Sequence, residues 1–115
     1  MEYDVVIVGG GPSGLSTAIK LKQLNPNINV CILEKAAEIG AHILSGNVFE
    51  TRALDELIPN WKDLNSPIKT KVKKEKFLFL SKSKSLSWPT WLLPKVQQNH
   101  KNYIISLANL CRWLA

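Results

Sequence analysis

Residues 5–14 read VVIVGGGPSG, an apolar run that ends in a cluster of glycines. These glycines include the spacing Gly-x-Gly-x-x-Gly, which falls on Gly9, Gly11 and Gly14. The apolar run is typical of a buried strand, which we predict over Tyr3–Val8. A glycine pattern at the end of a strand indicates the phosphate-binding turn of a dinucleotide fold, provided that a helix follows it.

The residues after the turn supply that context. A helix is predicted over Leu15–Leu24, since polar residues form one stripe and apolar residues fill the remaining faces. Pro26 ends it, and a second apolar strand is predicted over Ile28–Leu33. Glu34 follows that strand, 20 residues after Gly14. Together these features predict a Rossmann-like βαβ unit that binds a dinucleotide. The alternative is a glycine-rich turn that holds no ligand.

Each position in this pattern has a physical reason. Gly9 lets the chain turn sharply, because a residue without Cβ adopts backbone angles that other residues avoid. Gly11 leaves room for a pyrophosphate, and Gly14 lets the helix pack closely on the strand. The first helical turn offers unpaired N–H groups and a partial positive charge to that anion. Glu34 is placed to accept hydrogen bonds from a ribose, and its charge repels a 2′-phosphate, which argues against NADP.

The length of the chain limits what it can contain. At 115 residues and 12.9 kDa it forms one domain at most, and 45% hydrophobic residues indicate a globular fold. A complete two-half nucleotide-binding sheet needs more strands than the sequence offers. A helical pattern, with apolar residues at Ile104, Leu107, Cys111 and Leu114, also continues to the last residue without a stop signal. We therefore expect residues 1–115 to be the incomplete amino-terminal part of a longer nucleotide-binding protein.

The middle of the chain predicts smaller elements. A short helix is expected over Thr51–Ile58, and a loop with Ser45 precedes it. Phe77–Leu80 is typical of a strand, and a hydrophilic turn follows it. The predicted fold class is therefore α/β: a βαβ unit, then a loop and short helix, a β-hairpin and a truncated helix. Trp61 and Trp113 are expected in the core.

Positive charge is concentrated in one part of the chain. Residues 64–115 carry ten basic and one acidic side chain, and seven of the ten are lysines between Lys69 and Lys84. This lysine run lacks interleaved aromatic residues and any nucleic-acid motif, so no nucleic-acid partner is predicted. A solvated face is the expected role, and a docking patch for an acidic protein is the alternative.

The remaining reactive residues predict neither catalysis nor a metal site. Cys31 and Cys111 lack the spacing of a metal or redox motif, and we expect both to be reduced core residues of an intracellular protein. His42 and His100 are expected to be structural, because no nucleophile or acid accompanies them. No apolar run approaches the ~20 residues of a membrane span, and no signal or transit peptide is recognised.

Residues 77–96 form a candidate membrane-contacting hairpin. They combine tryptophans, which favour the water–lipid boundary, with apolar residues and flanking lysines. The alternative is an ordinary hairpin whose apolar side chains pack on the domain core. The side chains expected to contact lipid are Trp88, Trp91, Leu92 and Leu93.

Three further stretches resemble a known family. They are EKAAEIGAHILSG at 34–46, RALDELIPNW at 52–61 and NHKNYI at 99–104. The opening resembles FAD-dependent oxidoreductases in general, and these stretches resemble the electron-transfer flavoprotein–ubiquinone oxidoreductases. The first stretch discriminates best, since the glycine motif alone does not choose among flavoenzymes. The resemblance covers nearly the whole chain, in order.

The resemblance implies cofactors and partners. Members of the family hold FAD and one [4Fe–4S] cluster, take electrons from electron-transfer flavoprotein, and reduce ubiquinone at a membrane surface. It implies that Lys35 lies near the adenine, that Ala41 and His42 lie against FAD through main-chain atoms, and that 77–96 contact the membrane. The implied cofactor-binding residues are Gly9, Gly10, Gly11, Pro12, Ser13, Gly14, Glu34, Lys35, Gly40, Ala41 and His42.

The same resemblance limits the activity expected of this chain alone and implies its location. The cluster cysteines lie in the carboxy-terminal region of the family and have no counterpart in this chain, so an isolated chain is expected to be inactive. The implied location is the inner face of the bacterial cytoplasmic membrane, or the mitochondrial inner membrane in a eukaryote. The alternatives are a related flavoprotein, of the geranylgeranyl-reductase or monooxygenase kind, and a non-catalytic remnant.

Overall fold

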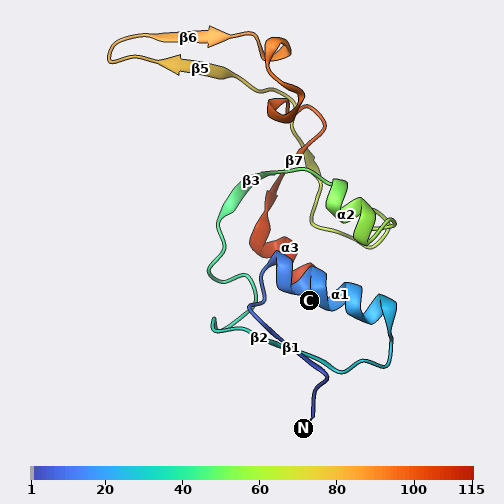
Figure 1. The fold of residues 1–115 in the computed structure, drawn as a ribbon. Coiled ribbons are helices and arrows are strands. Elements are labelled where there is room, and N and C mark those ends of the chain that lie inside the picture. The colour runs from blue at the N-terminus through green and yellow to red at the C-terminus, as the bar shows by residue number, and fades with distance from the viewer. Residues whose placement is uncertain (1) are drawn as a thin grey trace.

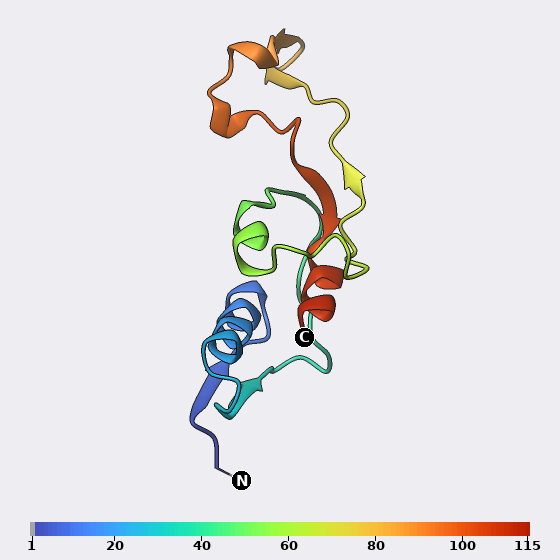
Figure 2. The same ribbon diagram turned by 90° about the vertical axis from the view of Figure 1, so that its right-hand side faces the viewer.

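The computed structural model describes residues 2–115 and shows an elongated α/β chain, 61 × 30 × 23 Å along its principal axes. Its radius of gyration, 18.1 Å, exceeds the ~13 Å typical of a compact domain of this length. Figures 1 and 2 show why: the first two strands of the chain lie at one end and a hairpin projects from the other. Met1 lies outside the described residues.

The βαβ unit predicted from the glycine pattern is present. Strand β1 (Val5–Val8) leads into helix α1 (Pro12–Leu24), and strand β2 (Val30–Leu33) returns parallel to β1. The register pairs Val8 with Leu33, so both strands end at the same edge. Because the carboxyl ends of parallel strands meet there, the glycine turn and Glu34 are brought together.

The two faces of this strand pair differ. Ile7 and Ile32 are half-buried on the side of α1, where Leu15 is 2% exposed. On the other face Val8 is 85% and Leu33 54% exposed. One face of the pair is therefore covered by its own helix, and the other presents apolar side chains to solvent.

A second sheet joins residues that are far apart in sequence. Strand β7 (Tyr103–Ser106) lies between β3 (Ser45–Phe49) and β4 (Thr70–Lys71), antiparallel to both. Two expectations are wrong here, since Ser45 belongs to a strand instead of a loop, and Ile104 belongs to β7 instead of the last helix. Helix α3 starts later and spans Leu107–Leu114.

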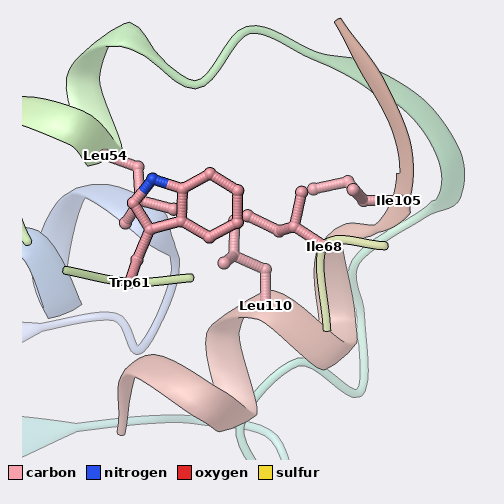
Figure 3. Close-up of a cluster of buried hydrophobic side chains, with 5 residues drawn as sticks. All are labelled: Leu54, Trp61, Ile68, Ile105 and Leu110. Carbon is pink, nitrogen blue, oxygen red and sulfur yellow. The ribbon is translucent and has the colours of Figure 1, made fainter. Parts of the chain in front are cut away.

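The main core lies between this sheet and the two short helices. Helix α2 (Arg52–Leu57) occupies the stretch predicted as a short helix. Figure 3 shows the buried cluster, in which Trp61, at 2% exposure, lies against side chains from α2, β7 and α3. The buried members are Leu54, Trp61, Ile68, Ile105 and Leu110. Trp113 packs on this cluster and is only partly buried.

The hairpin consists of β5 (Phe77–Leu80) and β6 (Ser85–Trp88), which pair antiparallel. The 3₁₀ turns η1 (Thr90–Leu92) and η2 (Lys95–Gln97) follow it. Every residue of both strands is exposed. Within residues 2–115, the two strands of the hairpin therefore do not pack on the buried cluster.

Candidate functional site

The glycine turn is tied to the end of β2 by its main chain. The N–H of Gly9 donates a hydrogen bond to the carbonyl of Leu33, with N and O 2.7 Å apart. Gly9 has φ +102°, a backbone conformation that side chains with Cβ rarely adopt. The sharp turn out of β1 therefore requires glycine at this position.

The next two glycines of the motif have different surroundings. A Cβ on Gly14 would lie 2.1 Å from the carbonyl oxygen of Gly9, so the first turn of α1 touches the turn backbone. A Cβ on Gly11 would meet nothing within 4 Å. Gly14 is required by packing of the protein itself, whereas the space beside Gly11 is open to a ligand.

Helix α1 begins at this open space. Gly11 is its N-cap and provides no side-chain acceptor, Pro12 is the first helical residue, and the first turn carries no acid. The partial positive charge of the helix start is therefore not neutralised by the side chains of its own first turn. An anion beside Gly11 would meet main-chain N–H groups and a favourable dipole.

The carboxylate of Glu34 is hydrogen-bonded to the glycine turn. Its Oε2 accepts a hydrogen bond from the N–H of Gly10 at 2.7 Å, and its Oε1 accepts one from the N–H of Ala36 at 2.8 Å. These two bonds, the one from Ala36 foremost, lower the pKa of the Glu34 carboxyl below its ordinary value of 4.5. The group is therefore ionised at neutral pH, and each oxygen keeps capacity to accept another donor.

The loop after Glu34 is fixed by contacts with α3. Gly40 is buried, has φ +84°, and a Cβ there would lie 2.8 Å from the carbonyl oxygen of Ala108. Arg112 also reaches back to Glu38, with Nη2 and Oε1 2.9 Å apart. Gly40 thus has a packing role, which sequence reasoning missed because its partner lies almost 70 residues away.

The other residues named from the resemblance lie on the surface of this loop. Lys35, Ala41 and His42 are exposed. His42 contributes electrostatically to the lowered pKa of Glu34, although as the smallest of the causes. The structure therefore joins the glycine turn directly to Glu34, and Ser13 lies exposed at the start of α1.

A hollow of about 640 Å³ lies beside the site without being part of it. Apolar side chains of α1, β2 and the end of α3 line it, including Leu15, Ile32 and Leu114. None of residues 9–14 contributes to its lining. The candidate dinucleotide site is therefore the open surface at the glycine turn and not this hollow.

The candidate lipid-contacting residues differ in exposure. Trp91 is 75%, Leu92 50% and Trp88 42% exposed, whereas Leu93 is half-buried. Within residues 2–115, no helix combines the length and apolar character needed to cross a bilayer. The same residues contain no group of three or more His, Cys, Asp or Glu side chains arranged to hold a metal ion.

The sequence profile of the Thi4 family matches residues 1–60, which include the glycine turn, Glu34 and α2. The chain belongs to the Thi4 family. The match covers the whole βαβ unit, so membership rests on the part of the chain that forms the candidate site.

Relatives match nearly the whole chain. The mitochondrial electron transfer flavoprotein–ubiquinone oxidoreductase of Dictyostelium discoideum is 54% identical over 117 residues, covering 98% of this chain and 19% of the relative. The Pseudomonas aeruginosa protein of that name is 53% identical, covering 100% and 22%. The mitochondrial protein of Bos taurus is 47% identical, covering 98% and 19%.

These matches confirm the resemblance identified from the residues. The chain spans about a fifth of the length of the curated relatives that it matches. The relatives are oxidoreductases by name, and the similarity extends beyond the family profile into the hairpin and α3.

Proposed function

We propose that this chain supplies the adenosine-diphosphate-binding part of the FAD site in an electron-transfer flavoprotein–ubiquinone oxidoreductase. The observation that carries the proposal is the pairing of an open space at Gly11 with an ionised Glu34, held on opposite sides of one turn. Similarity to oxidoreductases of that name supports the identity of the dinucleotide.

The residues present fit the pyrophosphate and ribose of FAD. The pyrophosphate would lie beside Gly11, where main-chain N–H groups and the dipole of α1 bind an anion. Glu34 would accept the ribose hydroxyls with the capacity that Gly10 and Ala36 leave free. Pro12 and Ser13 lie at the helix start, and the exposed residues Ala41 and His42 would lie along the cofactor.

The flavin ring of bound FAD supplies the electron transfer. Within this proposal no side chain of residues 2–115 acts as a catalytic acid, base or nucleophile. The chain binds and orients the nucleotide half of the cofactor. Electron-transfer flavoprotein is the proposed electron donor and ubiquinone the acceptor, and a [4Fe–4S] cluster would be bound by residues beyond those of this chain.

A titration of the chain with FAD tests the nucleotide site. Quenching of flavin fluorescence should report weak, saturable binding, since only the nucleotide half of the cofactor is contacted. ADP should compete with FAD, and NADP should not, because Glu34 repels a 2′-phosphate. Absence of any binding by FAD and ADP, with the chain folded by circular dichroism, would contradict the proposal.

The proposal places the protein peripherally on a membrane through its hairpin. Phe77 pairs with Trp88 and Phe79 with Leu86, so these four side chains share one face. Phe79 contacts Phe77 and Trp88 edge-on, with ring centroids 5.2 and 6.1 Å apart. The exposed aromatic face is suited to the interfacial region of a lipid bilayer.

The hairpin would lie flat on the membrane surface instead of inserting its turn into the bilayer. Lys82 and Lys84 occupy its turn and would have to enter the hydrocarbon in a tip-first orientation. A two-stranded sheet also leaves main-chain groups unpaired at both edges, which hydrocarbon does not tolerate. In a flat orientation the aromatic face meets lipid while the edges and lysines stay hydrated.

Co-sedimentation with liposomes tests the membrane contact. The double variant Trp88→Ala with Trp91→Ala should lose most binding, because it removes two interfacial aromatic anchors. A control double variant, Leu24→Ala with Leu44→Ala, removes two exposed apolar side chains outside the hairpin and should bind as the parent does. Unchanged binding of the alanine variant would remove the hairpin from the membrane contact.

A further inference from the structure

A basic cleft lies at the base of the hairpin. Residues 72–76 lead into the hairpin and residues 90–100 lead out of it, seen in yellow and orange in Figure 2. A cleft of about 550 Å³ lies between them, within the range of small-ligand sites. The residues that line it include Lys73, Lys74, Lys76 and His100.

The lysines of this cleft have no acidic partner. Among residues 2–115 the salt bridges are Arg52 with Glu50 and Arg112 with Glu38, and neither reaches the cleft. One carboxylate, Glu75, lines the cleft. Its Oε2 accepts hydrogen bonds from the main-chain N–H and the side-chain amide of Asn99, at 3.0 and 3.1 Å.

The bond from Asn99 to Glu75 also joins the two walls. Glu75 belongs to the incoming segment and Asn99 to the outgoing one, and the N–H of Val72 donates to the carbonyl of Asn102 at 2.9 Å. The two segments are therefore joined by one main-chain hydrogen bond and by the Glu75 carboxylate, whose charge is outnumbered by the three lysines of the lining.

We propose that this cleft binds the phosphate group of an anionic phospholipid. Trp91 lines the cleft and is 75% exposed, and the exposed aromatic strands of the hairpin begin one residue after Lys76. A ligand that joins a phosphate to acyl chains fits both features, whereas a free phosphate uses only the lysines. An acidic protein would leave the apolar hairpin without a partner. The inference rests on the membrane contact proposed above and adds headgroup selectivity to it.

Vesicle-binding assays distinguish the membrane contact of the hairpin from the phospholipid site proposed for the cleft. The chain should bind vesicles containing phosphatidylglycerol more tightly than vesicles of phosphatidylcholine alone. Each lysine close to an anionic surface contributes about fivefold in affinity. Binding to neither kind of vesicle would contradict the membrane contact itself, whereas equal binding to both would overturn the cleft proposal and leave the membrane contact standing.

Monomeric lipid distinguishes a built cleft from general surface charge. Short-chain phosphatidylglycerol, below its micelle concentration, should bind in a calorimetric titration. Lys73→Gln with Lys76→Gln should weaken this binding about 25-fold. The control, Lys82→Gln with Lys84→Gln, removes the same charge from the hairpin turn and should leave monomer binding unchanged. Equal losses in the two variants would overturn the proposal.

A third variant should bind the lipid more tightly than the parent does. Glu75→Gln removes the one acid of the cleft, while its amide oxygen can still accept from Asn99, so lipid affinity should rise several-fold. A fall in affinity would assign Glu75 a ligand-binding role that the proposal excludes. Inorganic phosphate or a polyglutamate peptide binding as tightly as short-chain phosphatidylglycerol would replace the lipid by a free anion or an acidic protein, and would overturn the proposal.

Discussion

The main-chain N–H of Gly10 donates a hydrogen bond to Oε2 of Glu34, across 24 residues, at 2.7 Å. The glycine turn and the acid are therefore joined directly, before any ligand is considered. The parallel register of β1 and β2 makes the contact possible, because it places Val8 opposite Leu33. Glu34 thus has two roles, one in holding the turn and one in offering its remaining acceptor capacity to a ribose.

Replacing Glu34 should weaken cofactor binding. Glu34→Ala removes a charged acceptor, and a hydrogen bond to a charged group is worth roughly tenfold or more in affinity. Glu34→Gln keeps an acceptor for Gly10 and should have a smaller effect. FAD titration of each variant measures the change. Equal affinity of the alanine variant and the parent would remove Glu34 from the site.

The same carboxylate predicts a pH dependence of stability. The folded pKa of Glu34 lies below its ordinary value of 4.5, so the unfolded chain binds the proton more tightly. Its contribution to stability is therefore fully present above pH 4.5 and is lost as the pH falls through the folded pKa. Thermal unfolding of the parent and of Glu34→Gln should differ at neutral pH and converge in acid. A difference that grows in acid would contradict the assignment.

Substitutions at Gly14 and Gly11 should have different effects, one on the stability of the fold and the other on FAD binding. Gly14→Ala places a methyl group 2.1 Å from the carbonyl oxygen of Gly9 and should destabilise the fold by about 1–3 kcal/mol. Gly11→Ala meets nothing within 4 Å, at an ordinary φ of −80°, and should leave the melting temperature nearly unchanged. Gly11→Ala should nevertheless abolish FAD binding, because its methyl group occupies the space for the pyrophosphate.

Thermal unfolding and FAD titration of both variants check this pair. If Gly11→Ala binds FAD as the parent does, the open space at Gly11 is not the pyrophosphate site. If Gly14→Ala is as stable as the parent, the close approach of α1 to the turn is not needed for folding.

The sequence was sufficient to predict the βαβ unit because each of its signals is local. The apolar run, the glycine spacing and the helix pattern all lie within 34 residues and specify adjacent elements. The sequence also placed Glu34 at the correct edge. It did not predict the bond to Gly10, since spacing indicates neighbourhood but does not identify a hydrogen-bond partner.

The region around β7 could not be predicted in the same way. Ile104 fits the apolar spacing of the helix that follows, yet it is 47% exposed on a strand while Ile105 is 4% exposed. That alternation over four residues is a strand signal too short to outweigh the helical pattern. Ile104 belongs to a strand because β7 pairs with β3, almost 60 residues earlier in the chain. No local sequence pattern reveals that pairing.

Gly40 should be needed for the loop that follows Glu34 to pack on α3. Gly40→Ala adds a methyl group 2.8 Å from the carbonyl oxygen of Ala108, at φ +84°. Gly46→Ala is a matched control, because Gly46 has φ +80° but a Cβ there would meet nothing within 4 Å. Both variants should lose about 1–2 kcal/mol from backbone strain, and Gly40→Ala should lose more. Equal melting temperatures would show that the loop can move away from α3 without cost.

The orientation of the hairpin can be tested with one pair of leucines. Leu86 lies on the aromatic face, opposite Phe79, and is 63% exposed, whereas Leu80 lies on the other face, opposite Ser85, and is 78% exposed. In a flat orientation Leu86→Ser should weaken liposome binding by about 1.5–3 kcal/mol, the free energy of burying a leucine side chain, and Leu80→Ser should have little effect. In a tip-first orientation both substitutions should weaken binding to a similar extent, because Leu80 and Leu86 lie on adjacent rungs next to the turn and both faces would enter the hydrocarbon. Co-sedimentation of the two variants with the same liposomes therefore distinguishes the two orientations by whether the losses differ.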